Sequence, residues 1–200
     1  MPDIKSETAP KNQRIYVNFC QPINKETADV LVTTLSKLLN ITQDIELYIL
    51  FSSEGGSVDV GIYIYNFLKG LPVKKIMHNI GYCQSIANIV FMAGDERHAC
   101  ENSSFLIHGQ TWNFFQNTSY DLQQINEVKN MLEDGEEKID AILVKETKLT
   151  KSFIRQCFTE GQSISSAKAL EFGIVQNVRE YKIDEGCKII TIDPKLAVNL

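Results

Sequence analysis

The chain has 200 residues, of which 44% are hydrophobic, and this length and composition predict one compact domain rather than two. Its formal net charge is -5 and it contains no basic cluster, so we expect no nucleic-acid partner. No run approaches the roughly 18 apolar residues of a membrane span, and the polar N-terminus lacks the apolar core of a signal peptide. We therefore expect a cytoplasmic protein without a membrane partner.

Strand and helix patterns alternate along the first half of the sequence. Residues 14–19 alternate as in a strand, and residues 25–41 repeat their apolar side chains with helical periodicity. The continuous apolar run at 45–51 is typical of a buried parallel strand, and the glycine turn after it opens a second helix. Another strand is expected at 73–80, before an apolar helix that begins at Ser85.

The second half continues with two short strands, at 97–100 and 104–109. A long polar helix is expected at about 120–146, followed by a shorter helix at 151–158. The last pattern is a helix in SAKALEFGIV, a turn at Gly173 and a terminal strand.

The spacing of these elements predicts right-handed βαβ crossovers in a layered α/β domain. This single domain is expected to cover residues 14–200. The polar segment before it, residues 1–13, is expected to be disordered.

The cysteines and two of the histidines are expected to be structural. Five cysteines are scattered without CxxC spacing, so we expect reduced thiols, no disulfide framework and no metal site. Cys83, two residues before Ser85, is either a buried packing group or a reactive thiol. We expect His78 and His98 to be structural residues.

Three features that could carry chemistry follow successive strands, at the edge of an open α/β sheet where ligands bind. The turn SSEGGSVDVG, with Gly55 and Gly56, is either a plain tight turn or a set of free N–H groups that holds an oxyanion. Ser85 is either the N-cap of its helix or a nucleophile. In the second case the N–H of Ile86 could face the oxyanion that develops on the substrate. His108 is either a hydrogen-bonded structural residue or the base that a serine nucleophile needs.

Three stretches of the chain match known motifs in the same order: IELYILFSSEGGSVDVGIYIYNFL, GYCQSIANIVFMAGDERHACENSSFLIHG and SISSAKALEFGIVQNV. The first is similar to a strand, a Ser-Pro-Gly-Gly turn and the following helix. The second resembles a Gly-x-Ala-Ala-Ser-Met segment, an Asn-Ser pair and a Met-Ile-His strand end, and the third a Leu-Ser-Ala and Glu-Tyr-Gly-Leu-Val-Asp tail. From about Arg14 to Val178 the chain thus resembles the proteolytic subunit of the Clp protease family, within the wider Clp/crotonase fold.

The resemblance implies a serine peptidase that hydrolyses peptide bonds inside an oligomeric chamber. Ser85 is then the nucleophile and His108 the general base, and the backbone N–H groups of Gly56 and Ile86 form the oxyanion hole. A protruding handle region at about 112–150 would interlock two rings of seven subunits. The implied partners are protein or peptide substrates, further copies of the chain and a AAA+ ATPase, and no cofactor is implied.

The sequence departs from the family pattern at several positions. The family's catalytic aspartate falls on Gly161, and Glu160 beside it is either the third member of the triad or a solvated loop charge. The acid of a serine peptidase fixes the histidine tautomer, and losing it costs on the order of 10⁴ in turnover. Glu54 replaces the proline of the turn, and Gln84 replaces the alanine before the nucleophile.

Two other functions stay open beside the peptidase. A catalytically silent family member would act as a scaffold or mixed-ring subunit, and Gly161 favours this alternative. A crotonase-type acyl-CoA enzyme would use the same pair of N–H groups without a Ser-His pair, and finding Ser85 and His108 together weighs against it. Labelling by a fluorophosphonate discriminates between the peptidase and the silent subunit.

Overall fold

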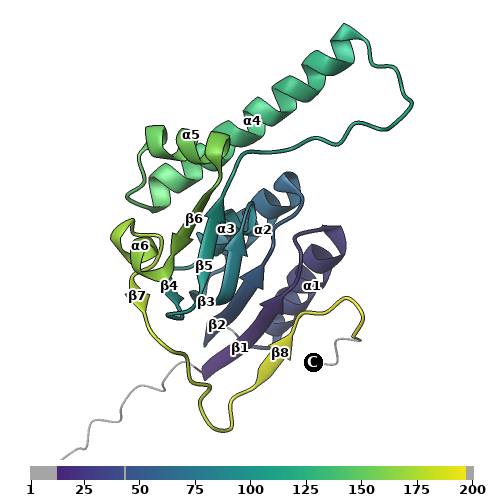
Figure 1. Cartoon of the computed structure of the whole chain (residues 1–200). Coiled ribbons are helices and arrows are strands. Elements are labelled where there is room, and N and C mark those ends of the chain that lie inside the picture. Colours follow the sequence, from purple (N-terminus) through teal and green to yellow (C-terminus); the bar gives the residue numbers. More distant parts are fainter. Residues whose placement is uncertain (1–12, 43, 197–200) are drawn as a thin grey trace, which may run out of the picture.

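The computed structural model describes residues 13–42 and 44–196, so the segment 1–13 that was expected to be disordered lies outside it apart from Gln13. In this part of the chain, one eight-stranded sheet has the order β6-β5-β3-β2-β1-β8, with β4 attached to β3 and β7 attached to β4 (Figure 1). All of its strand pairs are parallel except β5 with β6. The strands are β1 Gln13–Cys20, β2 Ile45–Ser53, β3 Lys74–Gln84, β4 Glu96–Ala99, β5 Ser104–Ile107, β6 Gln162–Ser165, β7 Asn177–Val178 and β8 Ile189–Thr191.

Helices α1 (Lys25–Ile41), α2 (Val58–Gly70) and α3 (Ala87–Phe91) pack on one face of the sheet (Figure 1). Helix α1 forms because its leucines recur at helical spacing and are buried, and because Asn24 closes a capping box with Thr27. Alternate side chains of β1 and β2 meet these helices and form the larger apolar core. The sheet and α2 together position the turns that follow β2 and β3.

The opposite face of the sheet is covered by the C-terminal segment before β8. Here Tyr16, Tyr48, Leu50 and Ile76 form a second apolar cluster, against which Ile183 packs. The hydroxyl of Tyr16 donates a hydrogen bond to Lys182 O at 3.0 Å and so ties the segment to β1.

His78 and His98 lie buried on this second face. Tyr48 Oη donates to His78 Nδ1 at 2.6 Å, and His78 Nε2–H donates to Arg179 O at 3.1 Å. Burial, with a smaller effect from His98, lowers the pKa of His78 to about 4. His78 therefore contacts the covering segment and lies on a different face from the turn after β3.

A projecting arm is formed by the loop after β5 and by α4 (Leu122–Glu146), which overlap the expected handle region 112–150 (Figure 1). Asp121 caps α4 by accepting from Gln124 N at 2.8 Å. At the other end, the buried carboxylate of Asp140 pairs with Arg155 of α5 (Lys151–Glu160), with 3.1 Å between Oδ2 and Nε. The arm is therefore anchored at its C-terminal end, while its N-terminal half extends from the domain.

The expected α/β architecture is confirmed, with local differences. Strand β3 continues to Gln84, beyond the expected end at residue 80, and α3 is only five residues long. Strand β6 was not expected, because its four residues QSIS carry too short an apolar pattern to be recognised. A short helix α6 (Ser166–Glu171) follows it, and none of the described helices combines the length and hydropathy needed to span a membrane.

Candidate active site

Ser85 lies at the sharp turn between β3 and α3. Its φ angle is +55°, an uncommon conformation for a residue with a side chain, and residues in such conformations cluster at functional sites. The N–H of Ser85 donates to Leu106 O at 2.9 Å, and Asn88 Nδ2 donates to both Ser85 O and Leu106 O. The interpretation of Ser85 as a helix N-cap is wrong, because Ile86 occupies that position and α3 begins at Ala87.

The glycine turn packs directly against Ser85. Gly55 has a φ angle of +93°, and a Cβ atom there would lie 2.8 Å from Ser85 Cβ and 2.7 Å from Gln84 O. Gly56 has a φ angle of +148°, and a Cβ atom there would overlap Ile23 O. Both positions therefore require glycine, so the turn is more constrained than a plain surface loop.

Two backbone N–H groups at this turn are unused. The bonds Ile23 N–H to Gly55 O (2.7 Å) and Ser57 N–H to Ile23 O (2.8 Å) hold the turn as a parallel bridge. In such a bridge the N–H of the middle residue, Gly56, points away from the partner strand. Among the described residues, neither this N–H nor that of Ile86 donates a hydrogen bond.

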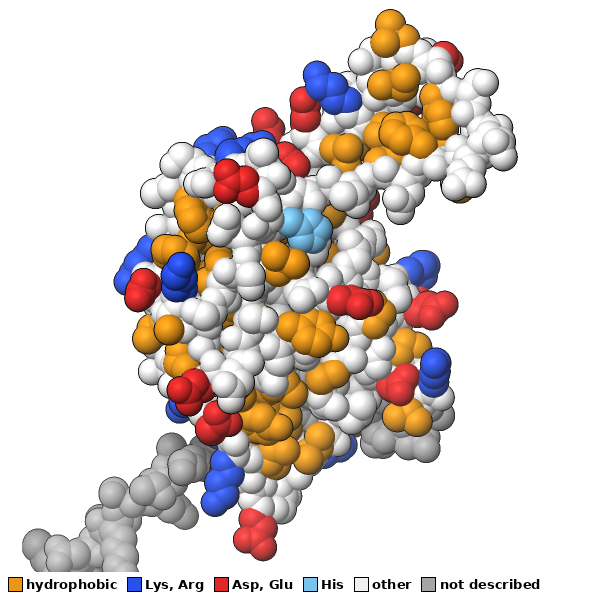
Figure 2. Space-filling view, in the orientation of Figure 1, with side chains coloured by type: hydrophobic (Ala, Val, Ile, Leu, Met, Phe, Trp, Pro, Cys, Tyr) orange, Lys and Arg blue, Asp and Glu red, His pale blue; other side chains and the backbone are white. Residues whose placement is uncertain are grey.

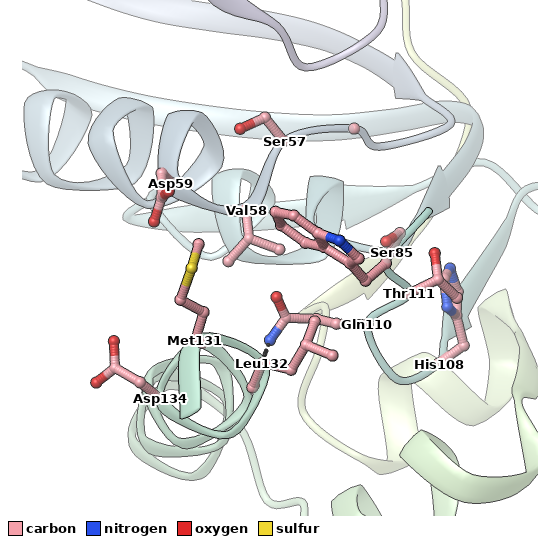
Figure 3. A pocket seen from close by; sticks show the side chains of 13 residues that line it. Ser57, Val58, Asp59, Ser85, His108, Gln110, Thr111, Met131, Leu132 and Asp134 are labelled. Atoms are coloured by element: carbon pink, nitrogen blue, oxygen red, sulfur yellow. Dashed lines mark hydrogen bonds between the residues drawn. The ribbon is translucent and has the colours of Figure 1, made fainter. Parts of the chain in front are cut away.

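His108 follows β5 and lines the same pocket as Ser85 and Gly56 (Figure 3). The pocket has a volume of about 330 Å³. The ring Nδ1–H of His108 donates to Gly109 O at 2.7 Å, since a carbonyl oxygen can only accept. This bond leaves Nε2 as the unprotonated nitrogen of the neutral ring, although no hydrogen bond joins it to Ser85 within the described chain.

Gly161 lies beside His108, as the pairing of β5 with β6 dictates. Ile107 pairs with Gln162, and the next pair outward brings Gly161 to His108. A Cβ atom on Gly161 would lie 3.9 Å from His108 Cβ, so a side chain there would reach the imidazole. Gly161 therefore occupies a position from which a carboxylate would reach the imidazole, and it carries none.

Glu160 is engaged elsewhere. Its Oε2 accepts from Gln156 Nε2 at 3.0 Å and from Gln162 Nε2 at 3.4 Å, and its side chain is exposed. The Nδ1 of His108 is already bonded to Gly109 O. In this arrangement a backbone carbonyl, rather than Glu160, orients the imidazole.

Cys83 does not join the site as a reactive thiol. Its side chain is completely buried, and burial raises the pKa of the thiol well above its ordinary value. All five cysteines carry free thiols. The packing interpretation of Cys83 is the one that the structure supports.

Sequence reasoning missed Asn88, which ties the Ser85 turn to β5. The signal was a single polar residue in the otherwise apolar run IANIVF, three positions after Ser85. Asn88 is 2% exposed, and a buried amide is expected to make specific hydrogen bonds. Its two bonds hold the strained turn in place.

Replacing Gly55 by alanine should destabilise the fold. The added methyl group collides with Gln84 O and Ser85 Cβ in a backbone conformation that alanine rarely adopts, so we expect a loss of more than about 2 kcal/mol. Gly70→Ala is the matched control, because nothing lies within 4 Å of its Cβ position, and it should change stability by less than about 1 kcal/mol. Urea unfolding measures both, and equal stabilities would contradict the close packing of the turn.

The chain is similar in sequence to members of one protein family. A family model described as Clp protease matches residues 7–182. The chain is 26% identical over 164 residues to the ATP-dependent Clp protease proteolytic subunit 2 of Treponema pallidum, covering 81% of this chain and 80% of that protein. It is also 26% identical over 162 residues to the ATP-dependent Clp protease proteolytic subunit of Chlorella vulgaris, covering 80% and 79% of the two chains.

A solved structure shares the fold. A mutant of ClpP1 from Listeria monocytogenes superimposes with a TM-score of 0.74 at 20% identity. The match covers 84% of this chain and 92% of that chain. The eight-stranded sheet and its helices therefore have the ClpP fold.

Proposed function

Because the chain belongs to the Clp protease family, we propose that it is a serine peptidase in which Ser85 is the nucleophile and His108 the general base. One observation carries this proposal: a strained serine turn, a histidine and the glycine turn of Gly56 line one pocket, and the N–H groups of Gly56 and Ile86, next to Ser85, make no hydrogen bond within the described residues. A serine nucleophile needs a base and a site for the oxyanion, and we propose that His108 and the N–H groups of Gly56 and Ile86 supply them.

The proposed reaction proceeds by acyl transfer. His108 Nε2 takes the proton of Ser85 Oγ while Oγ bonds to the peptide carbonyl carbon. The carbonyl oxygen becomes an oxyanion that accepts hydrogen bonds from the N–H groups of Gly56 and Ile86. The C–N bond then breaks as His108 gives its proton to the leaving amine, and water releases the acyl group by the same steps in the second half.

The backbone carbonyl of Gly109 takes the place of the third triad member in this proposal. It accepts the Nδ1–H of His108 and so selects the tautomer in which Nε2 is the base. A neutral carbonyl stabilises the imidazolium less than a carboxylate would, so turnover should be slow. A catalytically silent scaffold remains the second candidate, favoured by the absence of a carboxylate at Gly161.

Labelling by a fluorophosphonate tests the proposed function. The reagent reacts with an activated serine, and it requires the nucleophile, base and oxyanion hole but no turnover. We expect wild-type protein to be labelled stoichiometrically and to hydrolyse fluorogenic peptides slowly. Absence of both labelling and hydrolysis would favour the scaffold.

We further propose that the chain forms a homo-oligomer through its projecting arm. Figure 2 shows hydrophobic side chains gathered at the far end of this arm. Phe115 is 79% exposed, Leu122 74% and Ile125 46%, and such exposed apolar surface is typical of an interface. The relatives are named as proteolytic subunits of ATP-dependent Clp proteases, so we propose rings that cooperate with a AAA+ ATPase.

Light scattering tests the assembly. Wild-type protein at micromolar concentration should have a mass larger than that of a dimer. Ile125→Glu places a charge in the apolar surface of the arm and should reduce this mass, whereas Ile41→Glu, at an exposed residue of α1, should not. A wild-type monomer would refute the proposed assembly.

A further inference from the structure

The pocket extends away from Ser85 and His108 toward two carboxylates. Asp59 comes from the first turn of α2 and Asp134 from α4, and both line the pocket. Figure 3 shows Ser85 and His108 at one end and the two aspartates at the other, with Met131 between their carboxylates. The pocket therefore has a reactive end and an acidic end.

The stretch between these ends is largely apolar. Val58, Met131, Leu132 and Trp112 contribute to its lining. Gln110 donates to Leu132 O at 2.8 Å and packs on Gly135, where a side chain on the helix would overlap its amide. The loop after β5 is thus held against α4, and residues of both elements line this part of the pocket.

The acidic end carries a net negative charge. Asp134 pairs with Lys138 of the same helix, whereas Asp59 has no ion pair within the described residues. The hydrogen bond to Asp134 is the main cause that raises the pKa of Lys138, and the charge of Asp59 raises it further. Two carboxylates therefore line this end of the pocket, the ammonium group of Lys138 pairs with one of them from outside the lining, and the charge of Asp59 is left without an ion pair among the described residues.

We propose that this pocket binds the substrate side chain on the acyl side of the cleaved bond and selects a long cationic side chain, lysine or arginine. The aliphatic stem would lie along Val58 and Met131, as such stems commonly lie on apolar surface. The ammonium or guanidinium group would then reach Asp59. This inference rests on the proposed function for the position of the cleaved bond, but the charge preference is a property of the pocket alone.

Peptide binding, measured without catalysis, tests the preference of the pocket for a cationic side chain. Trp112 is the only tryptophan of the chain and lines the pocket, so its fluorescence reports occupancy. Two acetylated peptide amides that differ only in a C-terminal lysine or norleucine have equal stems and differ in charge. Exposed ion pairs contribute modestly, so we expect the lysine peptide to bind about 5-fold more tightly at low salt.

Three variants test which residues cause the preference for the lysine peptide. Asp59→Asn keeps the shape and should make the two dissociation constants nearly equal, whereas Lys138→Gln removes the competing cation and should widen their ratio to about 10-fold. Glu133→Gln is the matched control, because Glu133 lies on the same helix and lines a neighbouring groove instead. Thermal unfolding accompanies each titration, since Asp59 also lies in the first turn of α2.

The outcomes separate this inference from the proposed function. Equal binding of the lysine and norleucine peptides by wild type, or an unchanged ratio in Asp59→Asn, would overturn the cationic preference. Tighter binding of the lysine peptide without fluorophosphonate labelling would uphold the preference and overturn the peptidase instead. Labelling together with a preference for norleucine would leave the peptidase standing and refute the acidic selection.

Discussion

Ser85→Ala should abolish labelling by a fluorophosphonate and lower peptide hydrolysis by about 10⁴-fold or more. The hydroxyl is the only group at this turn that would form the acyl intermediate, and no neighbouring thiol replaces it, because Cys83 is buried. The oxyanion site and the pocket would survive the substitution, so binding of peptides should remain. Gel-based labelling and a fluorogenic peptide assay measure the two effects.

Ser57→Ala is the matched control for this experiment. Ser57 lines the same pocket and carries the same hydroxyl, and it precedes α2 without a side-chain capping bond. It should be labelled like wild type. Labelling that persists in Ser85→Ala but disappears in Ser57→Ala would transfer the role of nucleophile to Ser57.

Gly161→Asp should raise peptide turnover. The new side chain would start 3.9 Å from His108 Cβ and could replace Gly109 O as the acceptor of Nδ1–H. A carboxylate stabilises the imidazolium that forms during attack, and roughly 10⁴-fold is available if orientation is the only defect. The gain should be smaller, because Gly161 has a φ angle of +68° and ψ of 121°, which costs aspartate about 1–3 kcal/mol of stability.

Two further variants complete this experiment: the first separates charge from conformation at position 161, and the second tests the role of Glu160. Gly161→Asn has nearly the same shape and backbone strain as Gly161→Asp but no charge, so it should lose similar stability and gain much less activity. Glu160→Gln should be close to wild type, because Glu160 is held by Gln156 and Gln162. Steady-state kinetics with thermal unfolding distinguishes them, and a large loss in Glu160→Gln would make Glu160 the third triad member.

The elements that the sequence predicted well are those with long, periodic patterns. The helix expected at 25–41 has the same bounds in the structure, because its apolar spacing and its capping residue indicate the same start. The short α3 was predicted as a longer helix that starts at Ser85, because an apolar run does not reveal where a strand ends and a turn begins. That turn depends on contacts with Leu106 and Gly55, which are distant in sequence.

The sequence indicated the candidate residues Ser85 and His108, but not the hydrogen bonds and pocket residues around them. The family resemblance placed Ser85 and His108, and both lie at the ends of adjacent strands. The acceptor of the histidine proton could not be predicted, because it is a backbone carbonyl and every residue carries one. The acidic end of the pocket was also missed, because Asp59 and Asp134 are far apart in the sequence and line one pocket only in the folded chain.

Strand β8 completes the sheet at the edge of β1, and it is the last of the described strands to be synthesised. It pairs with β1, so the first described strand gains its second neighbour from the last one, with Tyr16 N–H bonded to Lys188 O and Ile192 N–H to Asn18 O. A ribosome that adds about 5–20 residues per second takes on the order of ten seconds to make the chain between them. From the pairing of β1 with β2 until β8 is made, β1 therefore presents an open edge, and such an edge can pair with strands of other chains.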